Sequence, residues 1–178
     1  MKRLFIVLIL ALYTQVPMIM GDPQIEEKYN VYDGQNIFYL KMPVSEVYRI
    51  LGQPDEILTV RNTAPFKDWD IVTLIYPGIV FRYIDFYDDP KIDVIALTGT
   101  GKEYQIGRLK VMGFTKNDML EIYGDPKYIT LRNENVYYRY TYSGPPYDEP
   151  SAHIEIQFRL NSDGICDEVM LIHNAFYI

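Results

Sequence analysis

The sequence predicts an α+β fold in which two tandem helix–β-meander repeats form one antiparallel sheet, with the helices on one face and an open concave face. Three observations lead to this prediction. Residues 42–54 and 114–126 resemble each other as an internal repeat. Both segments end in Gly-x-Pro, a signal that stops a helix. Both are followed by runs in which apolar and polar residues alternate, as in half-buried strands.

Each repeat is expected to open with a short helix. Thr115 and Asp118 have the spacing of a capping box at the start of the second helix. Pro43 suits the first turn of the first helix. A glycine tolerates the positive φ angle that often ends a helix, and a proline two residues later prevents its continuation. These structural residues are Gly52 and Pro54 in the first repeat and Gly124 and Pro126 in the second.

Three strands are expected after each helix. Alternation is clearest at 154–160, where Ile154, Ile156, Phe158 and Leu160 share one face. The predicted strands cover 69–76, 79–85 and 92–98 in the first repeat and 136–142, 154–160 and 165–173 in the second. When the two repeats are aligned, Tyr-Pro-Gly at 76–78 matches Tyr-Ser-Gly at 142–144, and Phe81-Arg82 matches Phe158-Arg159.

The chain is expected to divide into a signal peptide, 1–21, and two repeat units, 22–101 and 102–178. Two basic residues precede an apolar run at 4–13 that is too short to span a bilayer. This pattern predicts export, and hence a secreted or periplasmic location. An uncleaved N-terminal anchor is the alternative.

The charge and composition of the chain limit the classes of molecule that it is expected to bind. A net charge of −7 without a basic run argues against binding to nucleic acid or anionic lipid. No later segment is apolar enough to span a membrane, so no span is expected in the mature chain. Cys166 is the only cysteine and is expected to be a small buried side chain, with an intermolecular disulfide as the alternative.

No catalytic motif is present. The chain has two histidines and lacks both the Gly-x-Ser-x-Gly nucleophile elbow and the His-Glu-x-x-His metal motif. The glycine-containing segment 98–102 lacks the residues and the following helix of a phosphate loop. An acidic cluster is interpreted as a solvated hairpin tip rather than a metal site; it comprises Asp85, Asp88, Asp89 and Asp93. We therefore expect no enzyme activity, no cofactor and no metal.

Tyrosine is abundant, with 17 in the chain. Tyrosine, tryptophan and arginine are enriched at the centres of protein interfaces. The alternation places several such residues, with polar neighbours, on the strand face away from the helices or on the proline-rich loop at 144–150. The predicted partner-binding residues are Trp69, Arg82, Tyr137, Arg139, Tyr147, Glu155, Gln157 and Arg159.

The repeated helix ending and the aromatic strands resemble the repeat of β-lactamase inhibitory proteins. They are also similar to the small outer-membrane-assembly lipoproteins of the SmpA/OmlA type. The residues that carry the resemblance are Ile50 to Gly52, Pro54, Ile122 to Gly124, Pro126, Trp69, Tyr76, Phe81, Tyr142 and Phe158. The resemblance implies a bacterial extracytoplasmic protein that binds another protein through a concave sheet. The chain departs from both families, since the inhibitors carry two disulfides and the lipoproteins a lipidated cysteine.

The leading hypothesis is a secreted or periplasmic protein-binding module, either inhibitor-like or envelope-assembly-like. The alternative is an extracytoplasmic protein that binds a small ligand or glycan on tyrosine stacking platforms. A hydrolase with an unrecognised site is the third hypothesis.

Overall fold

The computed structural model describes residues 28–64, 67–85, 88–99, 101–107, 109–111, 113–132, 135–142 and 153–173. The predicted signal peptide, 1–21, and the loop residue Tyr147 lie outside the described residues. The described chain consists mainly of antiparallel strands in two sheets, with two helices of eight residues each.

The large sheet has eight strands in the order β3-β4-β5-β6-β12-β11-β10-β9. All neighbouring strands in it are antiparallel. The pairing of β6 with β12 joins the strands of the first half to those of the second. The strands are β3 (Glu56–Ala64), β4 (Lys67–Tyr76), β5 (Ile79–Asp85), β6 (Ile92–Thr98), β9 (Tyr128–Arg132), β10 (Asn135–Tyr142), β11 (Ile154–Leu160) and β12 (Cys166–His173).

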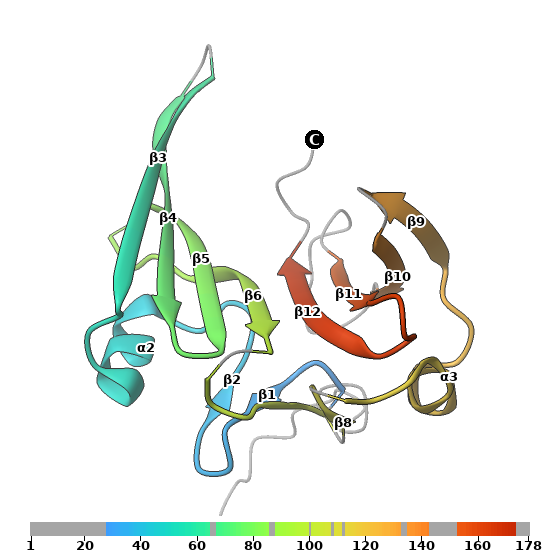
Figure 1. Cartoon of the computed structure of the whole chain (residues 1–178). Helices are drawn as coiled ribbons and strands as arrows, with labels where there is room; N and C mark the ends of the chain where they lie inside the picture. The colour runs from blue at the N-terminus through green and yellow to red at the C-terminus, as the bar shows by residue number, and fades with distance from the viewer. Residues whose placement is uncertain are drawn as a thin grey trace, which may run out of the picture.

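The small sheet has four strands of two residues each, in the order β2-β1-β7-β8. They are β1 (Val31–Tyr32), β2 (Ile37–Phe38), β7 (Gln105–Ile106) and β8 (Leu109–Lys110). Figure 1 shows α2 (Val44–Leu51), the small sheet and α3 (Lys116–Tyr123) along the lower side of the molecule. Because β1 pairs with β7, the small sheet joins segments from both predicted repeat units.

The predicted fold class is wrong. The protein is not one sheet with helices on one face, because a second sheet is present and the helices form a small part of the chain. Two-residue strands are too short to show alternation, so the small sheet left no pattern in the sequence. The edge strands β3 and β9 were also missed, since their apolar residues point to both faces. The division at residues 101 and 102 stays a prediction.

The core lies on one face of the large sheet, at the centre of which are Phe81 and Phe158. Phe38 of the small sheet contacts Phe81, with ring centroids 5.5 Å apart. Phe114 contacts Phe158 at 5.4 Å, and Tyr123 of α3 contacts it at 5.0 Å. This face is therefore covered by α3, by the residue Phe114 before it and by β2 of the small sheet. The contacts between these elements and the large sheet are made by buried aromatic rings.

Both helix endings follow the sequence signal, with one difference. The capping box of Thr115 and Asp118 is confirmed, and the helices end at Gly52 (φ 75°, ψ −151°) and Gly124 (φ 73°, ψ −157°). The positive φ angles are confirmed. The ψ angles, however, lie outside the left-handed helical region in which many helices end, in a region open essentially to glycine alone.

A tyrosine hydroxyl binds each helix end to the sheet. Tyr76 of β4 donates to the carbonyl oxygen of Gly52 at 2.9 Å, and Tyr140 of β10 donates to that of Gly124 at 3.0 Å. Burial raises the pKa of both tyrosines to about 12. Tyr140 is thus the counterpart of Tyr76, and the match with Tyr142 is wrong by two residues. The shift arises because β10 continues for two residues beyond Tyr140, whereas β4 ends at Tyr76.

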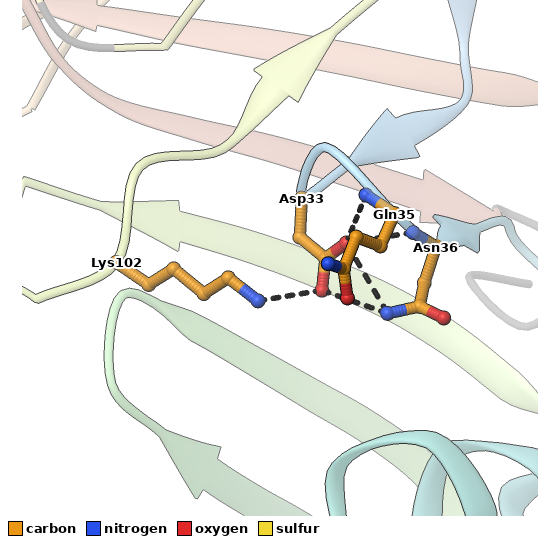
Figure 2. A network of polar contacts seen from close by, with 4 residues as sticks. All are labelled: Asp33, Gln35, Asn36 and Lys102. Atoms are coloured by element: carbon orange, nitrogen blue, oxygen red, sulfur yellow. Dashed lines mark hydrogen bonds and ion pairs between the residues drawn. The ribbon is translucent and has the colours of Figure 1, made fainter.

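A polar network holds the hairpin of the small sheet to the chain before β7 (Figure 2). The Asp33 carboxylate accepts from the backbone N–H groups of Gln35 and Asn36 at 3.0 and 2.7 Å. It also accepts from Lys102 Nζ at 2.7 Å. Burial raises the pKa of Asp33, but the hydrogen bonds from Lys102 and Asn36 outweigh it and hold the pKa well below its usual range. The carboxylate therefore stays charged and connects two distant segments.

Two side chains in β12 are buried polar or reactive groups. Cys166 is buried, as the sequence predicted, and burial raises the pKa of its thiol to about 12. His173 at the other end of the strand is also buried. Burial lowers the pKa of His173 to about 4, with smaller contributions from Lys41 and His153. The folded protein therefore holds this imidazole in its neutral form at neutral pH.

Gly52→Ala and Gly124→Ala should each destabilise the protein by about 1–3 kcal/mol, measured by urea unfolding. A Cβ at either position would have open space, so the cost comes from backbone strain and not from a clash. Glu121→Ala, at an exposed position within α3, is the control and should leave stability nearly unchanged. Equal midpoints for all three variants would contradict the strain argument.

His173→Gln should flatten the dependence of stability on pH between roughly 6.5 and 4. In this window the unfolded chain binds a proton at His173 and the folded chain does not. Wild-type stability should therefore fall as the pH falls from 6.5 to 4, and the variant should lose this component. The test is urea unfolding at a series of pH values, and identical slopes for the two proteins would be the contrary result.

Candidate functional site: the outer face of the large sheet

The candidate site is the face of the large sheet opposite Phe81 and Phe158, which we call the outer face. Alternate residues of each strand point to it. Its position follows from the pairing, because Thr73 lies opposite Arg82, Arg82 opposite Val94, and Arg139 opposite Gln157. The outer face therefore crosses all the strands of the large sheet and includes residues from both halves.

In the first half the outer face is largely apolar. Antiparallel sheets with one solvated face usually carry polar residues there. Here, half-buried apolar side chains continue from β4 into β12: Ile71, Ile75, Val80, Ile84, Val94, Ala96 and Met170. The edge strand β3 adds the exposed side chains of Leu58 and Val60. A connected apolar surface of this kind is typical of an interaction site.

Arg82 stands within this apolar surface. Its side chain is exposed, between Thr73 of β4 and Val94 of β6. Within the part of the chain that the structure describes, Arg82 has no hydrogen-bond or ion-pair partner. It thus presents an unpaired guanidinium group to any molecule that covers the apolar surface.

Trp69, on β4, lies on the same face as Ile71 and Thr73 and is half-buried. Its indole nitrogen is buried and, among the described residues, has no hydrogen-bond partner. A buried N–H group without an acceptor costs free energy, and proteins rarely leave one in this state. Because the nitrogen itself is buried, an acceptor from outside would reach it only if the side chains that cover it moved.

In the second half the outer face is polar, and its charged side chains form ion pairs with one another. Arg139 Nε and Nη2 donate to the two oxygens of Glu155 at 2.6 and 2.8 Å. This bond raises the pKa of Arg139. Gln157 also donates to Glu155, and Glu155 is only 3% exposed. Glu155 and Gln157 are thus buried within the sheet face, which is not open at this point.

Arg159 is held in the same way. Its Nε donates to Asp167 at 2.7 Å and its Nη1 lies 2.9 Å from Glu168. The bond to Asp167 raises the pKa of Arg159. A register shift next to Arg159 allows both carboxylates to approach it from β12. The cations of Arg139 and Arg159 are therefore neutralised within the protein.

Cations also lie over two tyrosines of this half, the half-buried Tyr137 and the exposed Tyr128. The Arg132 guanidinium is 5.9 Å from the Tyr137 ring centroid, and that of Arg139 is 5.8 Å from the Tyr128 ring. Lys127 Nζ is 5.5 Å from the same Tyr128 ring. Attraction between a cation and an aromatic face holds these side chains in place.

The structure divides the predicted partner-binding residues into two groups on one face. Five lie together on β10 and β11, namely Tyr137, Arg139, Glu155, Gln157 and Arg159. Trp69 and Arg82 lie apart from them on β4 and β5, and Tyr147 is outside the described residues. Sequence reasoning missed the partners Asp167, Glu168, Arg132 and Tyr128. The acidic pair lies in the predicted strand at 165–173, but nothing in the sequence revealed β9.

The described residues include no group of three or more histidine, cysteine or acidic side chains placed to hold a metal ion. In the acidic cluster, Asp93 accepts a bond from Lys41 at 2.5 Å. Among these described residues, no helix is long and apolar enough to cross a bilayer.

No protein-family model matches the sequence, and no curated protein is similar to it. Among solved structures, a DUF4309 family protein (YjgB) from Bacillus subtilis shares 19% identity, with a TM-score of 0.47, over 80% of this chain and 86% of that chain. A protein described as a candidate beta-lactamase inhibitor from Streptococcus mutans shares 18% identity, with a TM-score of 0.26, over 73% and 82%.

These likenesses are too distant to carry a functional argument. The description of the second neighbour names a beta-lactamase inhibitor, and the resemblance to the assembly lipoproteins is not shown.

Arg139→Met should destabilise the protein by about 2 kcal/mol, because it leaves the Glu155 carboxylate buried without its cation. Replacing both residues by methionine should recover most of this loss. The matched control is Arg49→Met, which breaks an exposed pair with Glu46 and should change stability little. The measurement is chemical unfolding, and a double variant no more stable than the single one would argue against a paired network.

Proposed function

We propose that the protein is a secreted or periplasmic module without enzymatic activity that binds another protein on its outer face. The observation that carries the proposal is the apolar surface of the first half, where Arg82 is exposed and unpaired. Interface centres combine apolar area with tryptophan and arginine anchors, as this surface does.

The chemistry of this surface suggests the kind of partner that it fits. A carboxylate set among apolar side chains would pair with Arg82 in a dry environment, where an ion pair is stronger than in water. The half-buried ring of Trp69 would add aromatic contact area to the same surface. We therefore expect an apolar protein surface that carries at least one acidic residue.

The second half supports protein binding over the ligand-binding alternative. A tyrosine serves as a stacking platform for a sugar when its ring face is free. Cations already lie over the rings of Tyr128 and Tyr137. The ion pairs of Arg139 and Arg159 also leave fewer groups to hold a ligand.

Arg82→Ala should weaken binding of the partner at least about tenfold, as expected for an interface anchor. The purified protein would first be used to capture binders from the secreted and envelope fractions. The captured protein would then be purified, and its Kd measured by calorimetry for the wild type and each variant. Trp69→Phe, which keeps most of the aromatic area and removes the N–H group, should weaken binding to a smaller degree.

Arg49→Ala is the matched control, since it removes an exposed arginine from α2, away from the outer face. It should leave the Kd unchanged. A partner that binds Arg82→Ala and Trp69→Phe as tightly as the wild type would overturn the proposed site. A bound sugar with no protein partner would favour the ligand-binding alternative.

A further inference from the structure

The large sheet ends on one side at β9, a strand that pairs only with β10 among the described strands. Its side chains are exposed toward both faces: Tyr128 is 52%, Ile129 61% and Leu131 71% exposed. An edge strand has unpaired N–H and C=O groups along its free side and can pair with another strand. Soluble proteins usually protect such an edge with a charge in its centre or a proline. In β9 the only charged residue is Arg132, at its end.

The sequence of β9 is complementary to itself about Thr130. In an antiparallel pair, directly opposed residues point to the same face. A two-fold axis between two copies of β9 must therefore pass through a residue position. With the axis at Thr130, Ile129 lies opposite Leu131 of the second copy, and Tyr128 lies opposite Arg132.

Each opposed pair in this register is favourable. Ile129 and Leu131, which are exposed on the core side of the sheet, would cover each other. Tyr128 and Arg132 would meet on the outer face and extend the existing cation–aromatic contacts of Arg132 with Tyr137 and of Arg139 with Tyr128. Thr130 would meet its own copy, a pairing that sheets favour. Moving the axis to Ile129 or Leu131 leaves residues of the strand without an opposed partner.

The opposite edge, β3, lacks this property. With the axis at Thr59, Ile57 would lie opposite Arg61 of the second copy. With the axis at Leu58, Glu56 would lie opposite Val60. With the axis at Val60, the central residue, Leu58 would lie opposite Asn62 and Ile57 opposite Thr63. The first two registers set a charged side chain against an apolar one and the third sets apolar side chains against polar ones. The β3 strand therefore fits itself poorly although it is the longer strand.

We propose that two copies of the chain associate through β9, with the two-fold axis at Thr130. The large sheets then join into one continuous antiparallel sheet, and both outer faces point to the same side. The contact consists of two short strands, so the dimer is expected to dissociate on dilution. The site lies several strands from Arg82, and the proposal is independent of the proposed function.

Thr130→Cys tests the register directly. Opposed residues in an antiparallel pair have Cα atoms about 4.5–5.5 Å apart, which suits a disulfide. Under mild oxidation this variant should form a covalent dimer, visible on a non-reducing gel. Thr59→Cys, an exposed threonine on the other edge strand, is the matched control and should stay monomeric. The native Cys166 is buried and should not contribute.

Sedimentation of the wild type over a range of concentrations supplies the second measurement. It should show a monomer–dimer equilibrium, and Leu131→Lys, a change at an exposed side chain, should abolish the dimer. Circular dichroism would verify that each variant folds. A wild type that stays monomeric at every concentration, or Thr130→Cys that crosslinks no faster than Thr59→Cys, would overturn the proposal. If Leu131→Lys instead weakened partner binding by a monomeric wild type, β9 would be assigned to a strand of the partner.

Discussion

The hydrogen bond from a tyrosine hydroxyl to the last carbonyl of each helix fixes how the helices attach to the large sheet. Tyr76 makes this bond to Gly52 and Tyr140 makes it to Gly124. The glycine is required because its backbone lies in a region that other residues avoid. The tyrosine is required because its ring reaches from the core face while its hydroxyl meets the helix end. Loss of either member would free the end of a helix from the sheet, and in the second half this helix carries Tyr123 onto Phe158.

Short helices attached at these two points leave part of the sheet uncovered. Each has only eight residues, and between them the small sheet brings Phe38 onto Phe81. At the two edges of the large sheet, Ile57 of β3 and Ile129 of β9 stay exposed on the core side. Apolar side chains are therefore left exposed at both edges of the large sheet. An exposed apolar edge strand can pair with another chain, either in a specific complex or in aggregation.

Sequence patterns predicted the features that depend on local chemistry. The capping box at Thr115 and the glycines that end the helices required only their neighbours in the chain. Features that depend on contacts between distant parts of the chain were harder to predict from the sequence. The small sheet consists of strands too short for a pattern, and the match of Tyr76 with Tyr142 failed because hairpin length differs between the halves. The burial of Glu155 was also missed, since an alternating strand assigns it to solvent, whereas Arg139 allows it to be buried as an ion pair.

The two halves of the outer face are formed by similarly arranged antiparallel strands, but their arginines differ in whether they are ion-paired within the protein. In the second half, arginines at 139 and 159 are each neutralised by carboxylates of a neighbouring strand. In the first half the strands around Arg82 supply apolar side chains and no carboxylate beside it in the pairing. A charge satisfied inside the protein gains little from a partner, because binding must first replace an existing bond. An unpaired charge in an apolar surface loses hydration on contact and needs a counter-charge from the partner. Recognition by this sheet should therefore depend mainly on its first half, whereas the second half provides a rigid frame and ends in the strand available for pairing.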